Sequence, residues 1–257
     1  MKNILKAKLL NGEKPLGMFT VLGGTITAEC LGMAGLDYFI LDTEHGVQDV
    51  ESVLPALIAA ERRDITPLVR VKDHSRASVL KMLDAGAMGL VVPFIHTVND
   101  VKTLVNYAKY APLGCRGYGI VRASGYGLAD YAQDTKEYFE LSNAQTLLLP
   151  QCETKSCLDH IEEIASLEGV DGIFVGPYDL SVALGVPGQM DDDSLNRGNE
   201  RVRAACDGAG KFSFIFAGNA ETANRYFHIG YSSVTCSVDA VALVRAVKSM
   251  TADIKRD

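Results

Sequence analysis

Residues 38–44 read YFILDTE, an uninterrupted apolar run that ends in acidic and polar side chains. Such runs are typical of strands in a parallel sheet, because helices cover both faces of that sheet. Seven further runs of the same kind recur along the 257-residue chain. The sequence therefore predicts eight strands, at 17–22, 38–44, 66–71, 89–95, 146–153, 172–177, 212–217 and 232–238.

Helical patterns separate these runs. Ser75 and Asn99 are predicted N-caps, and Gly86 is a predicted C-cap. Eight alternating units in one chain of this length predict a (β/α)8 TIM barrel that uses residues 1–257 as one domain. A doubly wound sheet is the alternative, although it usually has fewer strands and no GxGxxG follows the first run. The clearest predicted helices span 48–62, 75–86, 98–110 and 154–167.

Composition excludes several classes of protein. The chain is 47% hydrophobic and 22% charged, which is ordinary for a globular protein. A net charge of −7 argues against nucleic-acid binding, and no apolar stretch reaches the roughly 20 residues of a membrane span. The N-terminal segment carries interspersed lysines, so we expect an amphipathic first helix rather than a signal peptide. Six cysteines without a CxxC spacing indicate buried thiols in a cytoplasmic protein.

One segment interrupts the regular alternation. Residues 111–145 separate the fourth and fifth predicted strands, and 111–127 read APLGCRGYGIVRASGYG. Barrel enzymes build their active sites from loops that follow the carboxyl ends of strands. We therefore expect Arg122 or Arg116 to meet a charged end of the substrate. The alternative is a flexible loop on the surface.

Charged side chains gather where the predicted strands end. Glu153 and Asp179 follow neighbouring strands, and paired carboxylates suit a hard divalent cation such as Mg²⁺ or Mn²⁺. Arg70 would stabilise negative charge, and His45 is the natural general base near neutral pH. Taken singly, these residues also fit a helix cap, an ion pair and a turn histidine. Together they predict enolate chemistry, in which a cation polarises a carbonyl and a base moves a proton.

Several motifs resemble one enzyme family. In chain order they are ILDTEHGVQDVESV (40–53), PLVRV (67–71), YAPLGCRGYG (110–119), LPQCET (149–154) and GVDGIFVGPYDLS (169–181). Their order resembles that of the HpcH/HpaI aldolases, which are metal-dependent class II pyruvate aldolases. This resemblance extends over nearly the whole chain and implies a (β/α)8 barrel assembled as a hexamer.

The resemblance also implies roles for particular positions. Glu153 and Asp179 match the metal ligands, His45 the base and Arg70 the residue that stabilises the transition state. Asp84 matches an acidic residue that raises the basicity of the histidine. Near the end of the predicted helix 75–86, it would lie at the opposite face of its own barrel. Either a neighbouring subunit supplies it, or its match to the family position is only structural. The matching substrate contacts are Gln151, Gly176, Pro177, Tyr178 and Asp179, and the family usually has a small residue where Tyr178 stands.

The predicted reaction is the cleavage of a 4-hydroxy-2-oxo acid into pyruvate and a non-phosphorylated aldehyde, through a pyruvate enolate held by Mg²⁺, Mn²⁺ or Co²⁺. No glycine-rich phosphate loop follows the seventh or eighth strand, and Asp239 there would repel a phosphate. Three alternatives remain: oxaloacetate decarboxylation or another enolate lyase reaction, a Schiff-base aldolase that uses Lys72, and a non-catalytic binding barrel. The expected partners are these small molecules and further copies of the chain, with neither nucleic acid nor membrane.

Overall fold

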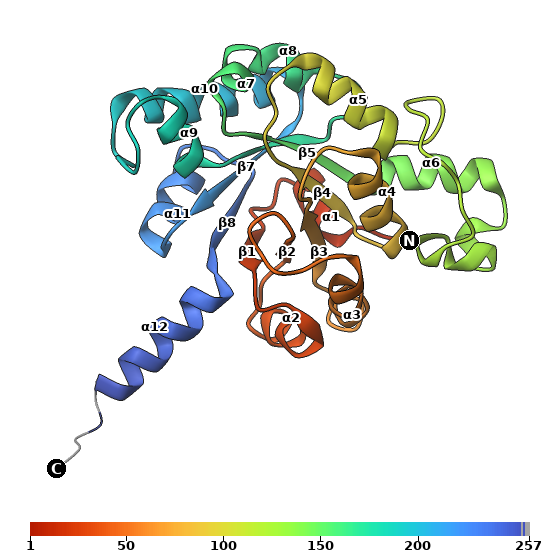
Figure 1. Cartoon of the computed structure of the whole chain (residues 1–257), viewed down its shortest axis with the longest axis horizontal. Helices are drawn as coiled ribbons and strands as arrows, with labels where there is room; N and C mark the ends of the chain where they lie inside the picture. The colour runs from red at the N-terminus through yellow and green to blue at the C-terminus, as the bar shows by residue number, and fades with distance from the viewer. Residues whose placement is uncertain (253, 255–257) are drawn as a thin grey trace.

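The computed structural model describes residues 1–252 and 254, and it confirms the predicted barrel. Eight parallel strands pair in chain order, and β8 closes the barrel by pairing with β1. Figure 1 shows the strands at the centre with helices around them. The strands are β1 (Leu16–Thr20), β2 (Tyr38–Asp42), β3 (Thr66–Arg70), β4 (Gly89–Val92), β5 (Leu147–Cys152), β6 (Gly172–Val175), β7 (Phe212–Ala217) and β8 (Ser233–Val238).

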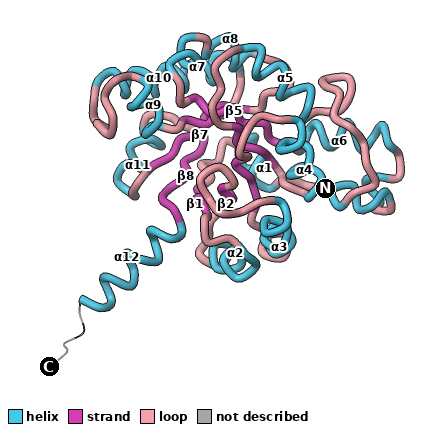
Figure 2. Tube along the Cα trace, in the orientation of Figure 1, coloured by secondary structure: helices cyan, strands magenta, loops and turns pink. Residues whose placement is uncertain are grey.

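Helices follow the strands, and Figure 2 shows how they alternate. The helix predicted over 154–167 is divided into two short helices, at 155–159 and 161–166. Two short 3₁₀ helices, η1 (Arg122–Gly127) and η2 (Asp130–Ala132), lie between α5 and α6. The α-helices are α1 (Ile4–Leu10), α2 (Gly24–Met33), α3 (Val50–Ala60), α4 (Arg76–Ala85), α5 (Val98–Ala108), α6 (Thr135–Gln145), α7 (Lys155–Asp159), α8 (Ile161–Ser166), α9 (Pro177–Ala183), α10 (Asp193–Ala209), α11 (Ala220–His228) and α12 (Asp239–Ala252).

Two of the three predicted helix caps are confirmed. Ser75 caps α4 by accepting a hydrogen bond from the Ser78 amide, and Gly86 ends that helix in the left-handed conformation at φ 105°. The predicted cap Asn99 is wrong, because it lies inside the first turn of α5. Thr97 is the N-cap there, and it forms a reciprocal capping box with Asp100.

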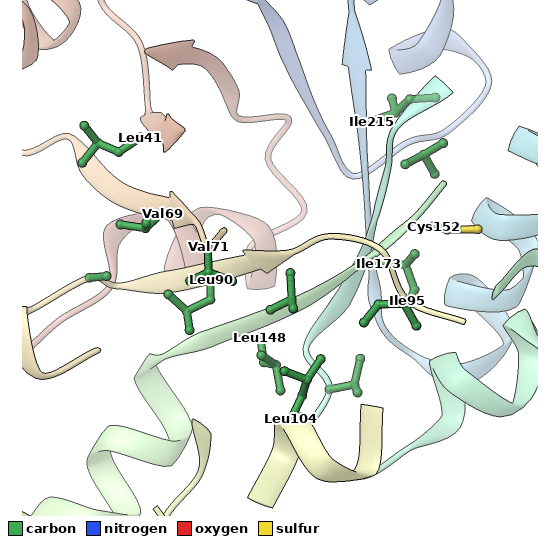
Figure 3. Close-up of a cluster of buried hydrophobic side chains, with 14 of the residues drawn as sticks. Leu41, Val69, Val71, Leu90, Ile95, Leu104, Leu148, Cys152, Ile173 and Ile215 are labelled. Atoms are coloured by element: carbon green, nitrogen blue, oxygen red, sulfur yellow. The ribbon is translucent and has the colours of Figure 1, made fainter. Parts of the chain in front are cut away.

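Alternation along the strands creates two apolar layers. Phe39 and Leu41 of β2 face the surrounding helices, whereas Tyr38 and Ile40 fill the barrel interior. Figure 3 shows part of the outer layer, between strands and helices, around Val69, Leu90 and other labelled residues. Because of this alternation, the last side chain of each strand points either into the barrel or toward the helices. Only those that point inward reach the opening at the carboxyl end of the barrel.

The first helix closes the amino-terminal end of the barrel. Leu5 and Leu9 of α1 are buried in the same cluster as the interior residues Tyr38 and Leu68. An amphipathic first helix is therefore confirmed.

The long segment 111–145 lies at the other end of the barrel from the one predicted. Helix α5 follows β4 and returns the chain to the amino-terminal end before the segment begins, so the segment is a helix-to-strand connection. Arg116 there forms an ion pair with Asp84, and Arg122 donates to the carbonyl oxygen of Ala85 and to Glu61. The expectation that these arginines meet the substrate within one chain is therefore wrong.

The last helix does not pack against its own barrel. In Figure 1, α12 extends away from the end of β8 into open space. Asp239, its first residue, is buried, whereas its apolar side chains are exposed, among them Val241, Leu243, Val244, Val247 and Met250. Such an apolar face on an isolated helix is unusual in a monomer.

Cysteine burial follows the sequence prediction only in part. Cys152, Cys157 and Cys206 are buried, but Cys30 and Cys115 are exposed. Among the described residues, no helix is long and apolar enough to cross a membrane.

Candidate active site

Every second residue of a strand points into the barrel, and at the carboxyl ends of β2, β3 and β5 these inward positions are polar or charged. In β2 the inward series Tyr38 and Ile40 continues to Asp42, and in β3 Leu68 is followed by Arg70. In β5 the same alternation leads through Leu149 to Gln151 and then Glu153. The strands therefore place these polar residues together, above an apolar barrel interior.

Arg70 is fixed by a two-pronged contact with Asp42. Its Nε donates to Oδ1 over 2.9 Å and its Nη2 to Oδ2 over 2.6 Å, and both residues are buried. The guanidinium also lies 4.8 Å above the ring of Phe19. Burial would raise the pKa of Asp42, but the hydrogen bonds and charge of Arg70 lower it below its ordinary value. The pair therefore stays ionised and holds one fixed cation at the mouth.

Glu44 belongs to this cluster, although the sequence analysis did not select it as a site residue. Its Oε2 lies 3.3 Å from Nε of Arg70 and has no hydrogen-bond partner. Burial raises the pKa of Glu44 to about 6, against the opposing attraction of Arg70. Its position two residues after Asp42, in the same DTEH stretch, could have identified Glu44 as a site residue from the sequence.

Glu153 is a buried carboxylate with both oxygens directed by neighbours. The Phe94 amide donates to Oε1 over 2.5 Å, and Nε2 of Gln151 donates to Oε2. A methyl group at Gly176 would lie 3.2 Å from Oε2 and 2.9 Å from Nε2 of Gln151, so a side chain there would crowd both. Burial raises the pKa of Glu153, and the charge of Asp179 raises it further.

The residues present fit a divalent cation. Glu153 and Asp179 line the same cavity, and their mutual repulsion is the kind that a bound cation relieves. The buried Oε1 of Gln151 and Oε2 of Glu44 lack partners, which adds oxygen donors nearby. Within the described part of the chain, no cluster of three or more His, Cys, Asp or Glu side chains could hold a metal. The protein therefore offers two carboxylates and leaves room for other oxygen ligands.

Two cavities that share lining residues open at this end. The smaller, of about 170 Å³, is lined by Arg70, Gln151 and Phe216 among others, and the larger, of about 570 Å³, by Glu153 and Phe94. His45 and Asp179 line both. His45 is exposed and lies three residues after the end of β2. It lines the cavities without being part of the buried ion-pair cluster.

The predicted substrate segment forms the start of α9. Gly176 and Pro177 are buried, and Asp179 lies in the first helical turn rather than at the N-cap, which is Gly176. The ring of Tyr178 packs on Phe216 with centroids 6.0 Å apart. All four residues 176–179 line the smaller cavity.

Two predicted residues lie elsewhere. Asp84 is near the end of α4, at the amino-terminal end of the barrel, and it pairs with Arg116 over 2.8 Å. One chain therefore does not bring Asp84 to His45. Lys72 pairs with Asp49 on the surface, and the lysine that lines the larger cavity is Lys155.

Comparison with known proteins agrees with this arrangement. A hydroxypyruvate/pyruvate aldolase of Agrobacterium fabrum is 32% identical over 257 residues, which cover 99% of this chain and 94% of the relative. A 4-hydroxy-2-oxo-heptane-1,7-dioate aldolase of Shigella sonnei is 31% identical over 254 residues, 98% of this chain and 95% of the relative. The crystal structure of an HpcH/HpaI aldolase/citrate lyase family protein from Burkholderia cenocepacia superposes with a TM-score of 0.90 at 33% identity, covering 98% and 99% of the two chains.

The closed barrel, its site and the names of these relatives together identify a (β/α)8 lyase, an enzyme that acts on carbon–carbon bonds. The match to the HpcH/HpaI aldolase/citrate lyase family spans residues 16–246. The chain belongs to this family, and it is an aldolase.

Proposed function

We propose that this aldolase cleaves a 4-hydroxy-2-oxo acid to pyruvate and a non-phosphorylated aldehyde, with a divalent cation held by Glu153 and Asp179. The observation that carries the proposal is the lining of two cavities at the carboxyl ends of the strands. Glu153 lines one and Arg70 the other, and Asp179 and His45 line both. The relatives' names support the aldolase reaction and a 2-oxo acid substrate.

The cation, when bound, would polarise the keto group of the substrate and offset negative charge that develops there. Arg70 adds a second positive charge whose position Asp42 fixes, so little reorganisation is needed during the reaction. Its burial and the adjacent Phe19 ring keep this charge in a site of low polarity, where it acts more strongly than in water. Mg²⁺, Mn²⁺ and Co²⁺ all suit these oxygen ligands.

His45 is the proposed base. It would take the proton from the C4 hydroxyl of the substrate, and the C3–C4 bond then breaks to release the aldehyde and leave the enolate of pyruvate. In the reverse direction the same imidazole returns the proton to the new alkoxide. Its place on the wall of both cavities suits a group that meets the acid at one side and the aldehyde at the other.

The surroundings of β8 support a non-phosphorylated aldehyde. Asp239 is buried at the start of α12 and accepts from the amides of Val21 and Leu22 over 3.0 and 3.2 Å. Barrels that bind phosphate use free amides in loops after the last strands. Here a carboxylate already occupies the amides next to β8, and its charge would repel a phosphate.

We propose that the active form is a homo-oligomer, a hexamer, in which α12 packs on a second copy. The exposed apolar face of α12 has no partner in its own barrel, and α2 exposes Ile26 and Met33 at 76% and 74%. A neighbouring subunit would also bring Asp84 to His45, which a single chain keeps at opposite ends. The cytoplasm is the proposed location, since Cys152, Cys157 and Cys206 pack in the core as thiols, and residues 1–257 form one proposed aldolase domain.

A coupled assay for pyruvate tests the function. Metal-free protein is mixed with 4-hydroxy-2-oxo acids, then Mn²⁺ is added, and pyruvate release should appear only with the metal. Borohydride with pyruvate serves as the control for a Schiff base and should trap no adduct on Lys155 or Lys72. Faster turnover of oxaloacetate than of every hydroxy-oxo acid would instead identify a decarboxylase, and no turnover at all would leave a binding protein.

A further inference from the structure

The loop after β4 contains a residue in a conformation that its side chain disfavours. Phe94 has φ 58°, in the left-handed region where a residue other than glycine is uncommon. Among the described residues only Asp64, Tyr126 and Ser237 share this feature without being glycine. The ring of Phe94 is 64% exposed, so its burial does not compensate for the strain.

The amide of this residue points at the candidate metal ligand. The N–H of Phe94 donates to Oε1 of Glu153 over 2.5 Å, while Gln151 donates to the other oxygen. Glu153 is 6% exposed and has no ion pair within 4.0 Å in the described structure. Its carboxylate orientation therefore depends on these two neutral donors.

The loop is held in place by the turn that follows β5. Oγ1 of Thr154 donates to the carbonyl oxygen of Ile95 over 2.6 Å, and Oγ of Ser156 donates to that of His96 over 2.7 Å. With the Phe94 amide, these make three hydrogen bonds between residues 94–96 and 153–156. The left-handed turn at Phe94 lets the amide and the two carbonyls all face this turn, and a strained conformation persists when its surroundings fix it in this way.

We propose that Phe94 is a positioning residue for the metal site: its left-handed backbone directs an amide that holds Glu153 in the orientation that binds the cation. The inference rests on the proposed function for the presence of the cation, but the hydrogen bond itself belongs to the protein alone. Residues that orient a metal ligand typically change metal affinity 10–100-fold when they are removed.

Substitutions that separate the backbone from the ring test the proposal. Phe94→Val keeps the amide but makes the left-handed conformation harder to reach, and Phe94→Pro removes the amide. Phe94→Gly removes the ring and relaxes the strain. Calorimetry of Mn²⁺ binding should give a dissociation constant raised about tenfold or more for the valine and proline variants, and within about threefold of wild type for glycine.

The matched control is Asp64→Val, which puts the same side chain on a left-handed residue, φ 53°, at the other end of the barrel. It should lower the melting temperature without changing Mn²⁺ affinity. Circular dichroism identifies variants that fail to fold. If folded Phe94→Val and Phe94→Pro bind Mn²⁺ as tightly as wild type, the proposal is overturned.

A measurement without metal separates this proposal from the proposed function. Amide hydrogen exchange of metal-free protein should show Phe94 protected in wild type, and Glu153→Ala should speed its exchange at least tenfold while leaving Val92 unchanged. Equal exchange in the two proteins would overturn the positioning role. Protection together with no Mn²⁺ binding in wild type would mean that the orientation of Glu153 is correct and that the metal-dependent function is wrong.

Discussion

Arg70 and Asp42 share two parallel hydrogen bonds, of 2.9 and 2.6 Å, across the adjacent carboxyl ends of β3 and β2. The register of the two strands places the residues directly opposite each other. This fork, the pair of hydrogen bonds between Arg70 and Asp42, therefore depends on backbone pairing as much as on charge. The pairing of the two strands therefore fixes the position of the positively charged guanidinium of Arg70.

Loss of the fork should reduce every reaction that passes through the enolate. For Arg70→Lys and Asp42→Ala we expect kcat/KM to fall by about 10²–10³-fold in both aldol cleavage and oxaloacetate decarboxylation, because the charge is no longer fixed. Asp42→Ala should also cost about 3 kcal/mol of unfolding free energy, since the buried guanidinium loses both hydrogen bonds and keeps only the ion pair with Glu44. Steady-state kinetics and urea unfolding measure these changes. Wild-type kinetics in Arg70→Lys would contradict the role of the fork.

The two carboxylates should act as one metal site. Glu153→Ala and Asp179→Ala are each expected to abolish tight Mn²⁺ binding in calorimetry and to abolish pyruvate release. Glu221→Ala is a suitable control, because that carboxylate lines a neighbouring cavity that contains neither residue. Turnover near the wild-type level in either variant, after chelation and without added metal, would show that the site is wrongly assigned.

His45 should matter for one reaction more than for the other. Aldol cleavage requires a proton to leave the C4 hydroxyl, whereas loss of CO₂ from oxaloacetate does not. For His45→Ala we therefore expect about 10²–10⁴-fold slower cleavage and a much smaller loss of decarboxylation. Parallel assays on one preparation give the comparison. Equal losses in the two reactions would assign His45 a role other than the base.

Glu44 predicts a pH dependence of stability in the metal-free protein. Its pKa rises from 4.5 to about 6 on folding because burial penalises the carboxylate. Below pH 4.5 the group is protonated in both states and carries no penalty. Between about pH 4.5 and 6 the folded state retains the proton that the unfolded state loses, so stability falls as pH rises, by about 2 kcal/mol in all.

Glu44→Gln should remove this fall. Relative to wild type, the unfolding free energy of the variant should increase by about 2 kcal/mol between pH 4.5 and pH 7, as measured by urea unfolding with chelator present. Glu51→Gln, on the exposed face of α3, is the control and should leave the pH profile unchanged. A pH-independent difference between Glu44→Gln and wild type would contradict the raised pKa.

The exposed helix α12 should control assembly. Val244 and Val247 are 53% and 44% exposed although they belong to an apolar face. The double substitution of both by Asp should shift sedimentation toward the 27.7 kDa monomer and reduce cleavage, because Asp84 would lose its route to a second subunit's His45. Lys248→Ser, on the same helix, should leave the assembly intact. A fully active wild-type monomer in sedimentation would contradict the oligomer.

Much of the site follows from the sequence because its geometry is local. The carboxyl ends of parallel strands meet at one end of a barrel, so the positions of Arg70 and Glu153 at the ends of predicted strands already placed them together. That Asp42 and Arg70 point to the interior is a result of the structure. In a (β/α)8 barrel consecutive strands are neighbours, so the predicted barrel also predicted which strands pair. The sequence alone therefore predicted the barrel and the charged residues at the carboxyl ends of its strands.

Other features depend on contacts between distant parts of the chain, and only the tertiary structure decided them. Arg116 and Arg122 lie at the amino-terminal end because they pair with Asp84 and Glu61 there, more than 30 residues away. The left-handed conformation of Phe94 depends on hydrogen bonds to residues 153–156, and a phenylalanine in the sequence does not predict it. The apolar pattern of α12 predicts a helix with one apolar face. Whether that face packs against its own barrel depends on the path of the chain after β8. Local periodicity thus determined the strands, whereas long-range packing determined where the connections and the last helix lie.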